Sequence, residues 1–115
     1  MKAITALLFL VLLFLMSLLP PFAEAAQIYG SLKEGEKSVG RGVEIAITCN
    51  NTPYRTTTEE DGSYRVFVRE RGKCRFTVTY RNRTAATDIY SFDDPTRYDF
   101  ELVRQPDGNY VLRRR

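Results

Sequence analysis

From residue 27 onward, the sequence consists of short runs in which apolar and polar residues alternate, with turn residues between them. The clearest run is Val43–Cys49 (VEIAITC), where valine, two isoleucines and cysteine occupy alternate positions. Successive side chains of a β-strand point to opposite faces, so this pattern predicts strands with one face on a core and the other in water. No stretch after residue 25 keeps a 3.6-residue period. The sequence therefore predicts an all-β sandwich or barrel.

Seven or eight strands are expected. They are Gln27–Leu32, Val43–Cys49, Tyr54–Glu59, Ser63–Arg69, Cys74–Tyr80, Thr84–Phe92, Tyr98–Val103 and Asn109–Leu112. Asp61-Gly62 is a two-residue turn signal, because both residue types tolerate the positive φ of a type I′ turn. We therefore expect the strands on either side of it to form a hairpin. The final three residues, Arg113–Arg115, have nothing to pack with, so this basic tail is expected to fray.

The first 25 residues have the organisation of a cleavable secretory signal peptide, which is helical in its apolar part. Lys2 supplies a basic start, Ile4–Leu19 is almost wholly apolar, and Pro20-Pro21 ends the helix. Ala23–Ala25 is a small-x-small triplet, which predicts cleavage before Ala26. The alternative is an uncleaved anchor, but an apolar run of about 16 residues is shorter than the roughly 20 that span a bilayer. We therefore expect no stable membrane insertion after cleavage.

Residues 26–112 are long enough for one domain with a modest core, followed by the tail 113–115. Cleavage of the leader removes one lysine and one glutamate, so the net charge stays at +3. Such a charge does not imply nucleic acid, and export argues further against it. The chain has no histidine, which removes the commonest general base and the commonest metal ligand. We expect a secreted or periplasmic protein with no cofactor and no metal.

Cys49 and Cys74 are the only cysteines of the chain, and both follow the leader. An even number of cysteines in an oxidising compartment predicts a disulfide. Each cysteine falls on the inward phase of its strand, one at the end of a strand and the other at the start. If those strands are antiparallel, the two ends meet. The bridge would close a loop of about 24 residues, which contributes roughly 3 kcal/mol on the chain-entropy model.

Several short motifs follow one another in an order that resembles a known family. They are Gly30 in the first strand, Gly42–Ile45, the threonine-rich Arg55–Thr58, Asp61–Tyr64, and Gly72 ahead of Cys74–Val78. Over about Gln27–Tyr80 this order resembles the carboxypeptidase regulatory-like domain, which has a transthyretin-like (prealbumin-like) fold. The resemblance implies a Greek-key β-sandwich of seven to eight strands. It also implies a non-catalytic module for folding, spacing or recognition. One departure is Cys74, which stands where the family usually has an aromatic residue after the glycine turn.

No nucleophile elbow and no phosphate-binding loop occurs in the sequence, so an enzyme is not expected. The candidate binding surface consists of Arg65, Arg69, Arg75, Tyr54 and Phe67. Clustered arginines hold anionic glycans or lipid phosphates through forked hydrogen bonds. The competing interpretation is that arginines on exposed strand faces are solvated and deter edge-to-edge aggregation. A calcium loop at Asp93-Asp94 is a weaker alternative, since its spacing matches no known loop.

Partner identity stays open between an unknown protein and a glycan or other component of the cell envelope. A carbohydrate site would bring exposed aromatic rings together on one face. The rings to inspect are Tyr29, Tyr54, Phe67, Tyr90 and Tyr98. A small secreted inhibitor or enzyme accessory subunit is a further alternative, and it would present one protruding apolar loop.

Overall fold

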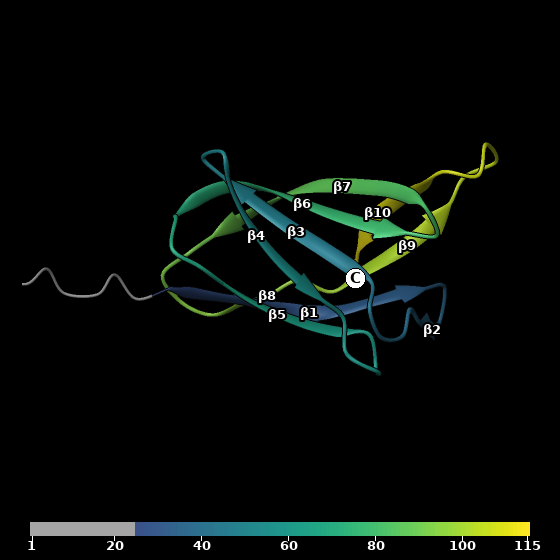
Figure 1. Cartoon of the computed structure of the whole chain (residues 1–115), viewed down its shortest axis with the longest axis horizontal. Helices are drawn as coiled ribbons and strands as arrows, with labels where there is room; N and C mark the ends of the chain where they lie inside the picture. Colours follow the sequence, from purple (N-terminus) through teal and green to yellow (C-terminus); the bar gives the residue numbers. More distant parts are fainter. Residues whose placement is uncertain (1–24) are drawn as a thin grey trace, which may run out of the picture.

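A computed structural model describes residues 25–115, which form two packed β-sheets and contain no helix (Figure 1). The predicted signal peptide lies outside the described residues, except for its last position. In the part of the chain that is described, no helix is long and apolar enough to cross a membrane. The prediction of an all-β sandwich is confirmed.

The first sheet has four antiparallel strands in the order β4-β3-β6-β7. The strands are β3 (Glu44–Cys49), β4 (Thr52–Thr57), β6 (Gly72–Tyr80) and β7 (Arg83–Ser91). Two tight hairpins build it, β3–β4 and β6–β7. Their central pairs, Asn50-Asn51 and Arg81-Asn82, all have positive φ between 48° and 65°, as a type I′ turn requires. Asparagine tolerates this conformation better than most residues, so the turns follow from local sequence.

The second sheet has six strands arranged around β1, and two of them are only two residues long. The strands are β1 (Ala26–Glu34), β2 (Lys37–Ser38), β5 (Ser63–Val68), β8 (Thr96–Arg97), β9 (Phe100–Arg104) and β10 (Tyr110–Arg114). The first half of β1 lies between β5 and β8, and its second half pairs with β2 and β9. On one side of β1 the sheet continues through β9 to the edge strand β10. All eight predicted strands are present, and β2 and β8 are additional.

The predicted hairpin at Asp61-Gly62 is wrong. The flanking strands β4 and β5 belong to different sheets, as Figure 1 shows. Only Gly62 of this pair has a positive φ (79°), and Glu59 accepts a hydrogen bond from the Gly62 N–H at 2.9 Å. The turn is therefore a three-residue loop ending in glycine. The arms separate because Thr58 stays bonded to Val43 in the first sheet, while Ser63 begins the pairing of β5 with β1.

The core lies between the inner faces of the two sheets, and the fully buried Phe76 of β6 sits at its centre. Its ring packs against Tyr64 of β5 at 5.3 Å and against Phe100 of β9 at 4.8 Å, measured between centroids. These three rings come from both sheets, so they join the layers. Tilted ring pairs of this kind add about 0.5–1.5 kcal/mol each beyond the area they bury.

At Gly30 the backbone of β1 passes too close to Tyr98 for any side chain to fit. A Cβ at this position would lie 1.9 Å from the Tyr98 carbonyl oxygen. That oxygen accepts a hydrogen bond from the buried Tyr64 hydroxyl at 2.6 Å. On the next residue of β1, the Ser31 N–H donates to a carboxylate oxygen of Asp99 at 2.9 Å. The first bond connects β5, and the second connects β1, to the chain between β8 and β9.

Tyr98 also joins the two sheets through its buried hydroxyl. This hydroxyl donates to the Tyr90 carbonyl at 2.9 Å and accepts from the Tyr90 N–H at 3.0 Å. Tyr90 lies on β7, an edge strand that pairs only with β6 among the strands of residues 25–115. One side chain thus satisfies both backbone groups of Tyr90, which the edge would otherwise expose, and it blocks pairing with another chain at this position.

Cys49 and Cys74 are bonded, with their Cα atoms 4.5 Å apart, and both are buried. Cys49 ends β3, Cys74 lies near the start of the antiparallel neighbour β6, and the register of the two strands brings them opposite each other. The predicted pairing is confirmed.

The expectation that Arg113–Arg115 frays is wrong. The first two arginines belong to β10, and each of the three makes contacts. Arg113 pairs with Glu101, Arg114 lies over the Tyr98 ring at 4.6 Å, and Arg115 donates to the Gly35 carbonyl at 2.9 Å. Charged side chains therefore extend the edge strand β10 beyond its apolar residues, Tyr110–Leu112.

Gly30→Ala should destabilise the fold by roughly 3 kcal/mol, because the added methyl group forces Tyr98 away from Tyr64. Urea unfolding at equilibrium measures the loss. Gly35→Ala is the matched control, since Gly35 has no atom within 4 Å of the new Cβ and its φ of 62° alone costs about 1 kcal/mol. Equal losses in the two variants would contradict the close-approach argument.

Reduction of the disulfide should lower the free energy of unfolding by roughly 3 kcal/mol. Urea unfolding with and without a reducing agent tests this on the unchanged sequence, which avoids the cavity that alanine would create. Mass spectrometry under non-reducing conditions should detect no free thiol. Two free thiols, or identical unfolding midpoints, would overturn the prediction.

Candidate functional site

The predicted binding residues do not form one surface. Arg65 and Phe67 lie on the outer face of β5 in the six-stranded sheet, whereas Arg75 lies on the outer face of β6 in the four-stranded sheet. These faces are on opposite sides of the sandwich. Arg69 follows β5 in the connection to β6. The arginine cluster suggested by the sequence is therefore not assembled within this fold.

Tyr54, the fifth of these residues, points toward the core edge and has a structural role. Its hydroxyl donates to the Glu70 carboxylate and accepts from the Arg69 N–H at 3.4 Å. The bond to Glu70 raises the pKa of Tyr54, and the same bond lowers the pKa of Glu70. Tyr54 thus connects β4, at the edge of one sheet, to the chain that leaves the other.

Asp93, from the acidic pair considered for calcium, and the nearby Asp88 face separate cationic partners. Asp93 pairs with Arg71 at 2.6 Å, and Asp88 pairs with Arg75 at 3.1 Å. Within residues 25–115 no three aspartate, glutamate or cysteine side chains gather as a metal-binding group. The side chains at Asp93-Asp94 therefore have no acidic cluster around them.

The five aromatic rings singled out in the sequence are scattered. Tyr98 is buried between the sheets and Tyr54 faces the core edge. Tyr29 and Phe67 lie on the outer face of the six-stranded sheet, while Tyr90 lies on the outer face of the other sheet. The ring cluster that a carbohydrate site requires is not formed by these five residues.

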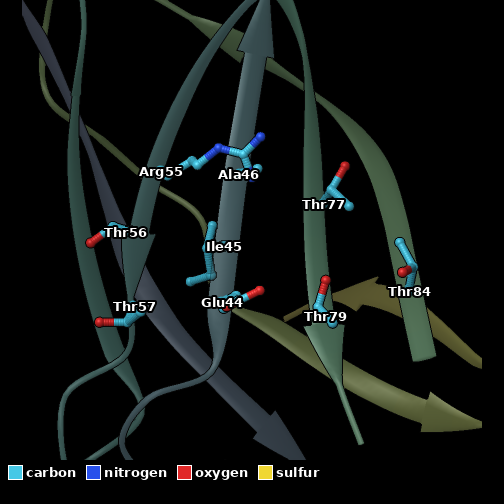
Figure 2. Close-up of a pocket in the computed structure, with 9 residues that line it drawn as sticks. All are labelled: Glu44, Ile45, Ala46, Arg55, Thr56, Thr57, Thr77, Thr79 and Thr84. Atoms are coloured by element: carbon cyan, nitrogen blue, oxygen red, sulfur yellow. The ribbon is translucent and has the colours of Figure 1, made fainter. Parts of the chain in front are cut away.

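A shallow hollow of about 550 Å³ lies on the outer face of the four-stranded sheet (Figure 2). Its main lining residues are Glu44, Ala46, Arg55, Thr77, Thr79 and Thr84. They are outward-facing positions, and strand register places Ala46 between Arg55 and Thr77. Figure 2 shows the Arg55 side chain extending from β4 across β3 beside Ala46. Small side chains form the floor because alternation puts alanine and threonine outward on β3, β6 and β7.

The polar groups of this hollow have no partners within the described chain. The hydroxyls of Thr77, Thr79 and Thr84 make no hydrogen bond to residues 25–115. Neither Arg55 nor Glu44 forms an ion pair there, although both lie on the same face. Donors and acceptors without internal partners can bind a polar ligand.

Two exposed rings that the sequence analysis did not pair lie further along the same face. Tyr90 of β7 is 50% exposed and Phe92, directly after β7, is 54% exposed. Their ring planes are 26° apart, with centroids 6.3 Å apart. The spacing of two residues on one strand was the available signal, since it places both rings on one face. Phe92 was not among the five rings singled out in the sequence.

A charged group separates these rings from the hollow. Asp88 of β7 contacts two cations of β6, Arg75 at 3.1 Å and Lys73 at 3.3 Å. The hydrogen bond from Arg75, followed by that from Lys73, holds the pKa of Asp88 below its usual range. Asp88 therefore stays ionised in mildly acidic solution, and the two cations share a single carboxylate.

Glu34 at the end of β1 is part of a second electrostatic cluster, at the far end of the sandwich. A hydrogen bond with Tyr110 has the largest effect on it and lowers its pKa, and a bond from Tyr80 at 3.1 Å acts in the same direction. Arg81 lies 3.6 Å from the same carboxylate and over the Tyr80 ring. The cluster connects β1, β10 and the turn between β6 and β7, so its role is structural.

Because the folded chain lowers the pKa of Glu34 from 4.5, this carboxylate stabilises the fold above that pH. The contribution is lost as the pH falls through the lower pKa of the folded state. Glu34→Gln should therefore reduce stability at neutral pH and make the urea midpoint less dependent on acid below about pH 4.5. Glu60→Gln is the matched control for loss of a carboxylate at an exposed position, since the Glu60 side chain is 80% exposed. Identical acid profiles for wild type and Glu34→Gln would contradict this role.

No family model matches this chain, and no curated protein matches it in sequence. Among solved structures, the fold is similar to the NMR structure of a protein from Eubacterium rectale, with a TM-score of 0.51 and 11% sequence identity. The similarity covers 79% of this chain and 88% of that one. At this identity the comparison shows that the two proteins share a fold and nothing about activity.

Proposed function

We propose that the protein is exported and acts as a non-catalytic binding or structural module of the carboxypeptidase regulatory-like type. The observation that carries the proposal is the bonded pair Cys49–Cys74 in a small sandwich, since disulfides persist mainly in oxidising compartments. The basic start, apolar run and small-x-small triplet of residues 1–25 support the same compartment. The two packed sheets are what the family resemblance leads one to expect.

A binding role is supported by the outer face of the four-stranded sheet. The core and Tyr98 hold the two sheets together and the disulfide links β3 to β6, and none of these contacts uses Arg55 or the hydroxyls of Thr77, Thr79 and Thr84. The alternative of a protruding inhibitory loop has less support. Among the described residues, the large exposed apolar side chains lie on strands or directly after one, at Phe67, Tyr90, Phe92 and Val111.

Export can be tested on the protein recovered from the cells that produce it. The mature N-terminus should read Ala-Gln-Ile-Tyr, as expected for cleavage before Ala26, and the protein should be found outside the cytoplasm. Recovery of Met1 on a membrane-bound form would overturn the cleavage prediction. A cytoplasmic protein with both thiols free would overturn the proposed compartment.

Binding is tested by incubating the labelled mature protein with an isolated envelope fraction of the same cells. Saturable retention is the expected result, and excess unlabelled protein should displace it. The heat-unfolded, reduced protein is the control for nonspecific adhesion. Retention that does not saturate would leave the module without a binding function and overturn that part of the proposal.

A further inference from the structure

The outer face of β6 and β7 carries three kinds of groups in a continuous line, here called the β6–β7 track. It consists of Thr77, Thr79 and Thr84, then Lys73, Arg75 and Asp88, then Tyr90 and Phe92. Alternate residues of a strand share a face and advance about 6.7 Å, so Thr84 and Tyr90 lie about 20 Å apart. A ligand that contacts the hydroxyls, the charges and the rings together must therefore be extended.

Tyr90 and Phe92 form a rigid apolar end of the track. Both rings are about half exposed, although the strand could have carried polar residues at these positions. Tyr98 holds both backbone groups of Tyr90, so the ring projects from a fixed strand. A platform that is already ordered binds with a smaller loss of conformational entropy. The hydrophobic C–H face of a sugar ring can stack on such a surface.

The centre of the track carries an excess of positive charge. Lys73 and Arg75 share the single carboxylate of Asp88, at 3.3 Å and 3.1 Å. Arg55 reaches over the sheet beside the hollow and forms no ion pair with residues 25–115, and Glu44 is the carboxylate that lines the hollow. Three cations thus face two carboxylates, which favours an anionic ligand. Arginine is well suited to a carboxylate, since its planar fork donates two parallel hydrogen bonds.

The hollow at the other end is lined by hydroxyl groups as well as methyl groups. Its floor of threonine and alanine side chains is open to solvent, and Ile45 beneath it is buried. Protein partners usually insert aromatic or aliphatic anchors into enclosed pockets. A ligand rich in hydroxyl groups can instead exchange hydrogen bonds with Thr77, Thr79 and Thr84.

We propose that the β6–β7 track binds a linear acidic glycan, with a sugar ring on Tyr90 and Phe92 and a carboxylate at Lys73 and Arg75. The inference rests on the proposed binding function and adds the chemical class of the ligand. Binding requires no metal and no covalent step.

Titration of the mature protein with hexagalacturonate, followed by amide NMR, tests the proposal. Shifts should be confined to β6, β7 and the hollow. Tyr90→Ala/Phe92→Ala should weaken binding at least about tenfold, as expected when contacts worth about 1.4 kcal/mol are lost. Phe67→Ala is the matched control, because Phe67 is a 56% exposed ring on the opposite sheet, and it should bind like the wild type. Both substitutions remove exposed rings, and the amide spectrum reports whether each variant is folded.

Two further comparisons separate the parts of the proposal. The methyl ester of the same hexasaccharide lacks the charges and should bind several-fold more weakly, and Thr77→Val should weaken binding with little change in side-chain volume. Overturning results are no binding of hexagalacturonate at millimolar concentration, equal binding of the ester, or an equal loss in Phe67→Ala. Polyglutamate binding that is as strong and insensitive to the ring variants would indicate an acidic polypeptide and also overturn it. If envelope retention persists while hexagalacturonate fails, the ligand class is wrong and the proposed function stands.

Discussion

The close approach of β1 to Tyr98 at Gly30 is the contact on which the arrangement of both sheets depends. β1 pairs with four other strands, and the chain between β8 and β9 can lie against it only because residue 30 has no side chain. That position of the backbone brings the Tyr98 carbonyl to the Tyr64 hydroxyl inside the core. It also directs the Tyr98 ring toward β7, where its hydroxyl closes the edge of the other sheet. One missing Cβ thus determines how the two layers are joined.

This concentration of structural contacts in the interior has a consequence for the outer faces. The two sheets are joined by the Phe76 ring cluster and by Tyr98, and the disulfide links β3 to β6 within the four-stranded sheet; all of these groups lie on the inner side of their strands. Glu34 and its tyrosine partners hold one end, and Tyr54 with Glu70 holds the other side. The outer groups of β6 and β7 contribute to none of these connections. Their composition is therefore under little structural constraint, which makes a mixed set of hydroxyls, charges and rings there informative about binding.

Local patterns predicted the strands and the disulfide because both depend on short-range geometry. Alternation assigns each residue of Val43–Cys49 to a face, and the phase of Cys49 and Cys74 follows directly. Strand order is different, since it depends on contacts between residues far apart in the chain. The hairpin expected at Asp61-Gly62 was wrong for this reason, because the turn was identified while the separation of its arms into two sheets was not. Arg65 and Arg75 likewise lie in different sheets, and no local sequence pattern shows to which sheet a strand belongs.

The end of the chain and the paired rings show a second limit. Arg113–Arg115 has no apolar residue, yet it completes β10 because Glu101, the Tyr98 ring and the Gly35 carbonyl receive its guanidinium groups. Such partners are recognisable only after the strands are placed. The strand pattern alone places Tyr90 and Phe92 on one face of β7, but aromatic residues at alternate positions are usually predicted to form the core face of a strand. What distinguishes them is the buried Ser91 between them, which shows that Ser91 points toward the core and the two rings point away from it. Exposure to solvent therefore distinguishes a ring that is available for binding from a ring of the core, and this exposure can be known only from the fold.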